Sequence, residues 1–480
     1  MISEDRVKEF EPIFHPKSVA LIGVSKDEGK VGNIFLRNFL DAGFEGKLYP
    51  INPNSDEIYG VMAYPSLREV PGTVDYAITI IPKRFILDTL DDCAARGVKA
   101  VQMFTAGFSE LGQEEGCQLE QAIAIKARKL GIRLLGPNCA GITCPGNPAN
   151  FALRPVLQMD GEVAIVSQSG GNLGALQEMG ALRGIRLGKL INYGNGCDLD
   201  CIEFLEYLAV DPETQIIGMY LEGVRNGPRL LELIREVSRS KPIVFWKGGR
   251  TEAGAGAALS HTASLAGSKA VWSAALRQAG AIEVENIEEV ADTLLAFQCL
   301  PGFQGSRAAV IAGLAAAGGG ASVAMGDACE SQGLRVIPLS TPAQDELRSF
   351  LPVEGRIFLN PLDISQAGSD PEKLTRILQI VLGETTVDVV IIHVATRVFL
   401  GYSPLERLGQ MADVLIDFKN KQSKPIVTVF NPSLHYDEQS AIEAKLSAAQ
   451  IPSYPTFERA ARAVANVIRY QEFKDGIEGS

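Results

Sequence analysis

Short apolar runs recur along the chain and are typical of strands buried in a parallel sheet. In the first third of the sequence they cover Ser18–Gly23, Leu48–Ile51, Tyr76–Ile81, Val101–Phe104 and Ile132–Leu135. Longer stretches with apolar residues at helical spacing separate these runs. Because parallel strands need a crossover connection, which a helix usually supplies, this alternation predicts an α/β fold with a Rossmann-like sheet.

The same alternation returns in the rest of the chain. A second set of runs covers Val163–Val166, Lys189–Ile191, Ile216–Leu221 and Ile243–Trp246, and a third covers Ala308–Ala312, Val389–Val394 and Pro425–Phe430. The glycine pair at 170–171 and the segment 184–187 reappear in the same order at 319–320 and 333–336. We therefore predict a Rossmann-like domain over residues 1–145 and two flavodoxin-like parallel-sheet domains over residues 146–300 and 301–480.

Charge and hydropathy exclude some classes of partner. The 480-residue chain has 57 acidic and 45 basic side chains and a net charge of −12, which argues against nucleic acid or an anionic membrane as a general partner. The long uncharged stretch 308–326 has three glycines at its centre, so it predicts a strand, a turn and a helix rather than a membrane span. The N-terminus lacks the apolar core of a signal peptide, and we expect a cytoplasmic protein.

The cysteines and histidines do not indicate a metal centre. The eight cysteines form no Cys-x-x-Cys pair, and the four histidines have no second histidine or carboxylate pair at ligand spacing. We therefore predict no metal ligands in this chain.

A glycine turn follows the first predicted strand and precedes a predicted helix. Such a turn, here Gly23–Asn33, presents backbone N–H groups and a helix N-terminus to an anion, usually a phosphate. Its spacing fits neither the dinucleotide fingerprint nor the P-loop, and no acidic residue follows the next strand at Asn52–Asn54. The pattern favours a nucleotide-like ligand other than NAD.

Loop-type residues also follow the other strands of the first sheet. Pro82, Thr105 and Asn138 each stand at the carboxyl end of a predicted strand. Plain turn chemistry would explain any one of them. Because the carboxyl ends of parallel strands meet at one crevice, together they outline a binding site.

The second predicted domain has two candidate functional groups at strand ends. Ser167–Asn172 places hydroxyls and glycines at a helix start, which suits an anion, although N-capping explains Ser169 almost as well. Glu222 follows the strand Ile216–Leu221, where a carboxylate could hold an imidazole N–H and fix its tautomer. A solvated loop glutamate is the alternative.

One histidine stands in an unusual context. Lys247–Ser268 is dense in glycine and alanine, and His261 lies near its middle between Ser260 and Thr262. Long segments of this kind are usually functional or disordered, and disorder usually comes with a more charged composition than this one. Neutral imidazole is a competent nucleophile near neutral pH. We interpret His261 as a nucleophile on a mobile arm, with a structural histidine as the alternative.

The motifs occur in an order that resembles a known family. They are the glycine turn Gly23–Asn33, Gly-Pro-Asn-Cys-Ala-Gly at 136–141, Ser-Gln-Ser-Gly at 167–170, Tyr-Leu-Glu-Gly at 220–223 and Ser-His-Thr at 260–262. The chain resembles the α subunit of nucleoside-diphosphate-forming acyl-CoA synthetases. Acetate–CoA ligase (ADP-forming) is the nearest form, and succinyl-CoA synthetase is a more distant one.

The resemblance implies a reaction and a set of site residues. Acyl-CoA and phosphate give acyl phosphate and CoA, His261 takes the phosphoryl group with Glu222 as its carboxylate partner, and a swinging loop passes it to ADP. Ser169, Gly170 and Gly171 would bind phosphate. The implied CoA site consists of Gly23, Ser25, Lys30, Gly32, Asn33, Pro82, Thr105 and Asn138.

The resemblance also implies a partner. ADP or ATP and Mg²⁺ would bind a β subunit with an ATP-grasp domain, and we expect two α and two β subunits. Acetate is the first expectation for the carboxylic acid. A CoA-dependent acyl or CoA transferase and a non-catalytic CoA-binding regulator remain as alternative functions.

Three departures from the family pattern stand out. Asn54 replaces a lysine common after Asn-Pro, which puts one CoA phosphate contact in doubt, and Ala263 replaces the glycine usual after His-Thr. The segment 313–320 of the third domain differs from the family's more polar glycine motif, so no site is assigned there.

Overall fold

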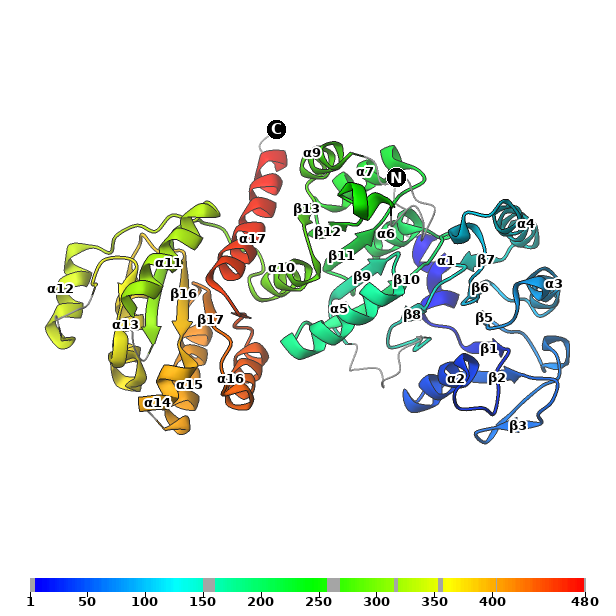
Figure 1. The fold of residues 1–480 in the computed structure, drawn as a ribbon, viewed down its shortest axis with the longest axis horizontal. Coiled ribbons are helices and arrows are strands. Elements are labelled where there is room, and N and C mark those ends of the chain that lie inside the picture. The colour runs from blue at the N-terminus through cyan, green and yellow to red at the C-terminus, as the bar shows by residue number, and fades with distance from the viewer. Residues whose placement is uncertain are drawn as a thin grey trace. The chain divides into compact units, whose positions relative to one another are not determined.

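The computed structural model describes residues 5–149, 160–256, 268–314, 318–352, 357–402 and 404–478. Its contacts divide the chain into two compact units. The first comprises residues 1–181 and 186–290, and the second comprises residues 182–185 and 291–480. Figure 1 shows the elements of each unit.

The first unit opens with a five-stranded parallel sheet in the order β2-β1-β5-β6-β7. Its strands are β1 (Ser18–Ile22), β2 (Lys47–Ile51), β5 (Tyr76–Thr79), β6 (Ala100–Met103) and β7 (Arg133–Leu135). The helices are α1 (Asp5–Phe14), α2 (Val31–Asp41), α3 (Ile86–Ala95) and α4 (Glu114–Leu130). A two-stranded ribbon, β3 (Glu57–Ile58) and β4 (Val61–Met62), and three 3₁₀ turns at Leu67–Glu69, Lys83–Phe85 and Ser109–Leu111 complete it. The Rossmann-like prediction is confirmed.

A second sheet of the same unit has the order β13-β12-β11-β9-β10-β8. Its strands are β8 (Gly141–Thr143), β9 (Val163–Ser167), β10 (Leu187–Asn192), β11 (Ile216–Leu221), β12 (Ile243–Lys247) and β13 (Ile282–Val284). The helices are α5 (Gly170–Arg183), α6 (Cys201–Val210), α7 (Gly227–Val237) and α9 (Lys269–Ala279), and α10 (Ile287–Cys299) begins in this unit and continues into the second. All pairs are parallel except β8 with β10.

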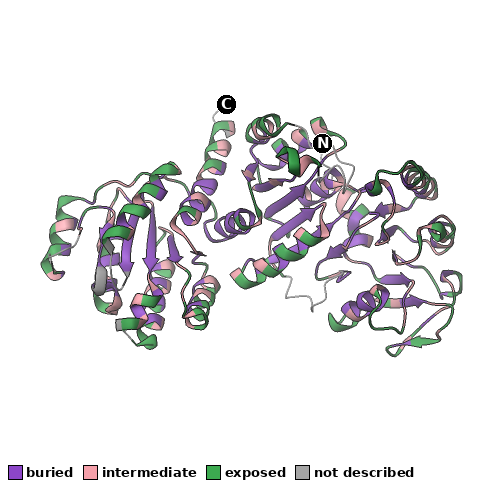
Figure 2. Ribbon diagram, viewed as in Figure 1, coloured by how far each residue is buried: buried purple, intermediate pink, exposed green. Residues whose placement is uncertain are grey.

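The two sheets of the first unit share one hydrophobic core. Phe10 and Phe14 of α1 pack on Phe204 and Tyr207 of α6, and the rings of Phe14 and Tyr207 stack 4.3 Å apart. The strands are buried along most of their length, whereas the helices show one exposed face (Figure 2). This shared core holds the carboxyl ends of the two sheets in a defined relation.

The second unit is a parallel sheet in the order β15-β14-β16-β17-β18. Its strands are β14 (Ala308–Leu314), β15 (Leu362–Asp363), β16 (Val389–Val394), β17 (Ile426–Phe430) and β18 (Ser453–Tyr454). The helices are α11 (Gly318–Ser331), α12 (Thr341–Phe350), α13 (Pro371–Gly383), α14 (Thr396–Tyr402), α15 (Leu405–Lys421), α16 (Tyr436–Ala448) and α17 (Phe457–Glu478), with a 3₁₀ turn at Ser365–Ser369. Buried Asp292 accepts hydrogen bonds from Arg183 and Arg459.

The strand predictions agree with the structure except at short strands. The sequence pattern did not indicate β3, β4, β8, β13, β15 and β18, which have two or three residues each. The segment 360–363 contains β15, and Asn360 is buried and bonded to the backbone of Val310, Ala308 and Ile337. The domain boundaries remain a prediction. None of the helices in the described ranges has the length and apolar character that a membrane crossing requires.

Candidate active site

The carboxyl end of the first sheet, here the first edge, carries the residues expected to bind CoA. Gly23 follows β1 with φ +98°, a conformation that favours glycine. A Cβ atom on Gly32 would lie 2.5 Å from the carbonyl oxygen of Gly23, so α2 packs directly on the glycine turn. The turn and the helix N-terminus thus form a backbone surface open to close approach, which fits a phosphate-bearing ligand.

Side chains hold this turn in shape. The Asn33 amide nitrogen donates to the Ser25 carbonyl at 3.0 Å, and the Asn33 amide oxygen accepts from the Tyr59 hydroxyl at 3.1 Å. Asn52 donates to the Val24 carbonyl at 2.6 Å. Lys30 is exposed at the N-cap position of α2, where no side chain caps the helix. The helix N-terminus therefore keeps donors available to an anion.

The loops after β5, β6 and β7 are linked to one another. The Thr105 hydroxyl donates to the Ile81 carbonyl at 2.6 Å, next to Pro82, and the Asn138 N–H donates to the Thr105 carbonyl at 3.0 Å. Asn138 has φ +55° and a half-buried side chain. The structure thus brings Pro82, Thr105 and Asn138 together along one edge, as the strand pattern predicts.

A cavity of about 240 Å³ lies beside the glycine turn. Its lining includes Gly23, Pro53, Ile81 and Phe85 and is mostly apolar. A flat apolar group joined to a phosphate at the turn suits this space.

Asn192, at the end of β10, joins the first edge to the carboxyl end of the second sheet. Its amide oxygen accepts from the Ala140 N–H at 2.5 Å, and its amide nitrogen donates to the carbonyls of Ser167 and Gln168 at 2.9 and 3.0 Å. The Asn192 side chain is 1% exposed. A ligand that runs along the first edge past Asn138 would therefore meet the Ser167–Gly170 loop.

The second edge, formed by Ser169, Gly170, Gly171, Glu222 and Lys247, begins with the N-terminus of α5. The Ser169 hydroxyl accepts from the Asn172 N–H at 3.3 Å, so Ser169 caps the helix. Gly170 and Gly171 form the first turn, and the space where a Gly171 side chain would stand holds only the Ser169 hydroxyl at 3.9 Å. Ser169 therefore caps the helix, and this role is compatible with an anion site at the same helix N-terminus.

Glu222 is a buried carboxylate beside this helix start. Its side chain is 8% exposed, and its Oε1 accepts from the Tyr220 hydroxyl at 3.1 Å. Its Oε2 is buried and has no hydrogen-bond partner among the described residues. Burial and the Glu222 carboxylate together raise the pKa of Tyr220, which remains a hydrogen-bond donor. The unpartnered oxygen favours a functional carboxylate over the solvated loop glutamate.

Gln168 and Lys247 hold the backbone around Glu222. The Gln168 side-chain oxygen accepts from the N–H groups of Glu222 and Gly223 at 2.9 and 3.3 Å. The Lys247 ammonium group donates to the Glu222 carbonyl at 2.7 Å and to the Gly248 carbonyl at 2.5 Å. Burial lowers the pKa of Lys247 to about 8, although Glu222 acts in the opposite direction.

His261 lies outside the described residues, which stop at Gly256 and resume at Ser268. Both flanks of that segment reach the same carboxylate. Arg250 donates to the Glu285 side chain at 2.9 Å, and Lys269 donates to it at 3.3 Å. Both ends of the segment that contains His261 are therefore held at Glu285, next to β13 in the sheet that carries Glu222.

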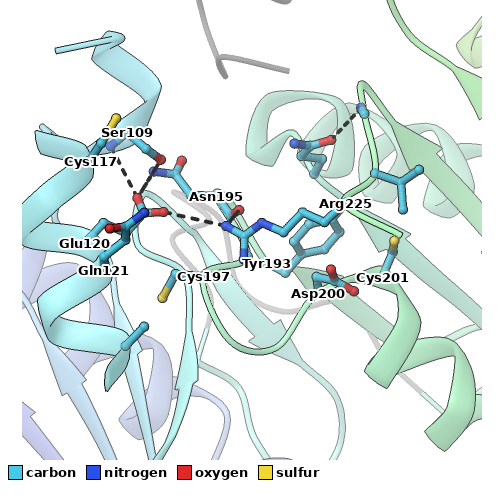
Figure 3. Close-up of a pocket in the computed structure, with 15 residues that line it drawn as sticks. Ser109, Cys117, Glu120, Gln121, Tyr193, Asn195, Cys197, Asp200, Cys201 and Arg225 are labelled. Atoms are coloured by element: carbon cyan, nitrogen blue, oxygen red, sulfur yellow. Dashed lines mark hydrogen bonds and ion pairs between the residues drawn. The ribbon is translucent and has the colours of Figure 1, made fainter. Parts of the chain in front are cut away.

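A larger cavity of about 510 Å³ lies between α4 and the loop after β10 (Figure 3). Asn195 projects from that loop and donates to Glu110 and Glu120 at 2.7 and 2.9 Å, and Arg225 reaches the Asn195 carbonyl at 3.3 Å. Burial alone would raise the pKa of Glu110, but the hydrogen bonds from Asn195, Gly107 and Phe108 outweigh it and lower the pKa. Gln168 and Gly223 also line the cavity, which thus adjoins the second edge.

The arrangement suits group transfer. It combines a phosphate-type turn, a helix N-terminus and a buried carboxylate with one unused oxygen. No group of three or more potential metal-ligating side chains occurs within the described ranges.

Comparison with known proteins shows the family. A model described as a CoA binding domain matches residues 17–145, and one described as a succinyl-CoA ligase like flavodoxin domain matches residues 160–297. The α subunit of acetate–CoA ligase (ADP-forming) II of Pyrococcus furiosus is 35% identical over 97% of this chain and 99% of its own length. The chain belongs to the α-subunit family of ADP-forming acetate–CoA ligases.

Two further members of the acetate–CoA ligase family place the chain in context. Acetate–CoA ligase (ADP-forming) I of Archaeoglobus fulgidus is 35% identical over 96% of this chain, but that match covers only 64% of the Archaeoglobus protein. The solved acetyl-coenzyme A synthetase 1 of Ca. Korarchaeum cryptofilum, in complex with phosphate and ADP, is 32% identical. Its TM-score is 0.85, with 98% of each chain covered.

Sequence reasoning did not single out Asn192, Asn195 or Lys247, and it quoted Gln168 only as part of a motif. One signal was available for Lys247, which is a charged residue at the end of the apolar run Pro242–Trp246. The other three are polar residues near glycine turns and give no pattern of their own.

Proposed function

We propose that this chain catalyses acyl transfer and histidine phosphorylation as the α subunit of an ADP-forming acyl-CoA synthetase. Phosphate attacks the thioester of acyl-CoA, giving acyl phosphate and CoA. His261 then takes the phosphoryl group and releases the carboxylic acid, and ADP takes the phosphoryl group from His261 to give ATP. The buried Glu222 carboxylate with an unpartnered Oε2 is the observation that carries this proposal.

The helix N-terminus and the carboxylate of the second edge have separate roles in this scheme. Ser169, Gly170 and Gly171 bind the phosphate at the N-terminus of α5, where backbone N–H groups and the helix dipole favour negative charge. Glu222 accepts a hydrogen bond from one ring nitrogen of His261, which leaves the other nitrogen as the nucleophile. The carboxylate also stabilises the positive charge that develops on the ring.

The first edge binds CoA. Gly23 and Gly32 allow the phosphates to approach the backbone, and Ser25, Lys30 and Asn33 contribute to the same turn. Pro82, Thr105 and Asn138 guide the rest of the molecule toward the second edge, which Asn192 connects to the first edge.

The nucleotide belongs to a partner in this proposal. The Pyrococcus relative is named an α subunit, and the Archaeoglobus relative extends beyond the matched region. We infer a β subunit with an ATP-grasp domain that holds ADP or ATP and Mg²⁺, in an assembly of two α and two β subunits. Mg²⁺ would neutralise charge on the nucleotide phosphates.

Acetate is the acid that we propose, because two relatives at 35% identity over 97% of the chain are named for it, whereas relatives named for 4-hydroxybutyrate and trans-feruloyl-CoA match at 31% and 30%. A panel of acyl-CoAs, assayed for ATP formation in the presence of the partner, ADP and phosphate, tests this choice.

The two alternative functions have less support. A transferase would form its acyl-enzyme on a carboxylate or a cysteine. Burial raises the pKa of Cys139, the cysteine in the Gly136–Gly141 loop, to about 12, and the relatives at 35% identity are named ADP-forming ligases rather than transferases. A CoA-binding regulator would not need a buried carboxylate with an unused oxygen beside a helix N-terminus.

The decisive experiment is phosphorylation of the full chain from acetyl-CoA and radioactive phosphate. The wild-type protein should incorporate phosphate that is labile in acid and stable in base, as a phosphoramidate is. His261→Asn should incorporate none while CoA binding persists. Incorporation by His261→Asn at the wild-type rate would rule out the phosphohistidine.

A further inference from the structure

Two buried lysines flank the same strand of the second sheet. Lys241 precedes β12 and Lys247 ends it, and they are 9% and 1% exposed. Each ammonium group donates to two backbone carbonyls, Lys241 to those of Leu208 and Asp211, both at 2.7 Å. Lys247 bonds to the carbonyls of Glu222 and Gly248. The two lysines make the same kind of contact at opposite ends of one strand.

The Lys247 contacts join two segments whose relative position matters for the proposed reaction, the one at Glu222 and the one that begins at Gly248. Glu222 follows β11, and Gly248 is the first residue after β12, where the segment leading to His261 begins. Leu221 pairs with Lys247, and the Gly248 N–H donates to the Leu221 carbonyl at 2.8 Å. The Gly248 backbone is so close that a Cβ atom there would lie 3.2 Å from Cγ of Glu222. The same Cβ atom would lie 2.7 Å from the Tyr220 hydroxyl, which donates to Glu222, so the Gly248 backbone packs directly beside both side chains.

The burial of the Lys247 charge is costly. Among the described residues Lys247 forms no salt bridge, and the centroid of the Trp272 ring lies 5.5 Å from its ammonium nitrogen. Taking an ammonium group out of water costs free energy, which its hydrogen bonds to the two carbonyls and the attraction of the Glu222 carboxylate offset. Local rules of this kind are broken most often where function requires it.

We propose that Lys247 is a positioning residue, which ties the backbone of Glu222 to that of Gly248 and so sets the Glu222 carboxylate against the root of the segment that carries His261. This inference rests on the proposed roles of Glu222 and His261. Lys247 acts through Glu222 and does not touch the reacting atoms. Phosphoryl transfer to histidine depends on such placement, because a displacement of about 1 Å can cost on the order of 10² in rate.

The test compares Lys247→Met with Lys241→Met in the full chain. Both variants leave two buried carbonyls without a donor, so both should melt at a lower temperature. Only Lys247→Met should slow histidine phosphorylation from acetyl-CoA and inorganic phosphate, on the order of 10²-fold, with the KM for acetyl-CoA unchanged. Lys247→Arg, which keeps the charge and the donors, should recover part of the rate. Equal rates in the two methionine variants would overturn the proposal.

A double-mutant cycle separates action through Glu222 from an independent effect. If Lys247 acts through Glu222, the double variant Lys247→Met with Glu222→Gln should be no slower than the slower single variant. Multiplied defects would overturn the proposal. If Lys247→Met does not fold, Lys247→Gln replaces it, and a wild-type phosphorylation rate in Lys247→Gln would also overturn the proposal. Normal phosphorylation rates in Glu222→Gln and His261→Asn would refute the proposed function itself. If those two variants are slow and Lys247→Met is normal, only the role of Lys247 is refuted.

Discussion

The carboxyl edges of the two sheets in the first unit present different kinds of group. The first edge offers backbone and small side chains, with Gly23 and Gly32 in close contact and Lys30 exposed to solvent. The second edge buries Glu222 and Lys247 beside the N-terminus of α5. A backbone surface binds phosphate with little desolvation of charged side chains, whereas buried charges are costly to hold but act strongly on a reacting group. We therefore propose that the first edge serves binding and the second serves the chemistry.

We expect the largest effect from a change at Glu222, which should alter the phosphorylation rate but not CoA binding. Glu222→Gln keeps the shape and removes the charge, so the rate of histidine phosphorylation should fall by about 10²–10³-fold while CoA affinity stays the same. Rapid-quench measurement of phosphate incorporation and calorimetric titration with CoA report the two quantities. The matched control is Glu203→Gln on α6, which removes the charge of another partly buried carboxylate of the same domain. Burial, with repulsion from Asp200, raises the pKa of Glu203 to about 7. A normal phosphorylation rate in Glu222→Gln would erase the contrast between the edges.

We expect a smaller effect from a change at Gly32, which should weaken CoA binding but leave the phosphorylation rate little changed. The added methyl group of Gly32→Ala would press on the Gly23 carbonyl, and overpacking of this kind costs about 1–3 kcal/mol. CoA affinity should fall by about tenfold or more, with phosphorylation at saturating acetyl-CoA little changed. Gly174→Ala on α5 is the control, since no atom lies within 4 Å of its added carbon and alanine favours a helix. Equal CoA affinities in the two variants would contradict a backbone-built binding edge.

The smallest effect concerns the pH dependence of stability. Burial lowers the pKa of Lys247 to about 8; Arg250 also lowers it, and Glu222 raises it. The Trp272 ring lies beside the ammonium group. Between about pH 8 and the usual lysine pKa of about 10.4, the unfolded chain binds a proton that the folded chain does not, so this residue makes stability rise with pH. Lys247→Met should lack that rise in its free energy of unfolding. Parallel curves for the two proteins from pH 8 to 10 would argue against a buried, titrating Lys247.

Local patterns predicted much of the fold but little of the second edge. The apolar runs located β1, β11 and β16 to within a residue or two, because burial on both faces of a sheet demands an uninterrupted apolar run. The short strands β3, β4, β8, β13, β15 and β18 were not predicted, since two or three residues show no periodicity. Glu222 was found because it directly follows a strand, but its unpartnered oxygen could not be read from its neighbours in sequence.

By itself, the sequence determined the three-part α/β order, the position of each glycine turn after its strand, and the family to which the motifs belong. These features depend on residues close together in the chain, namely periodic burial, conformations that favour glycine, and polar residues at strand ends. Only the tertiary structure decided that Asn192 joins the two edges and that Lys247 ties Glu222 to Gly248. Those contacts arise from strand register and from a core shared by two sheets, where residues far apart in sequence meet and a buried polar group must find its partners.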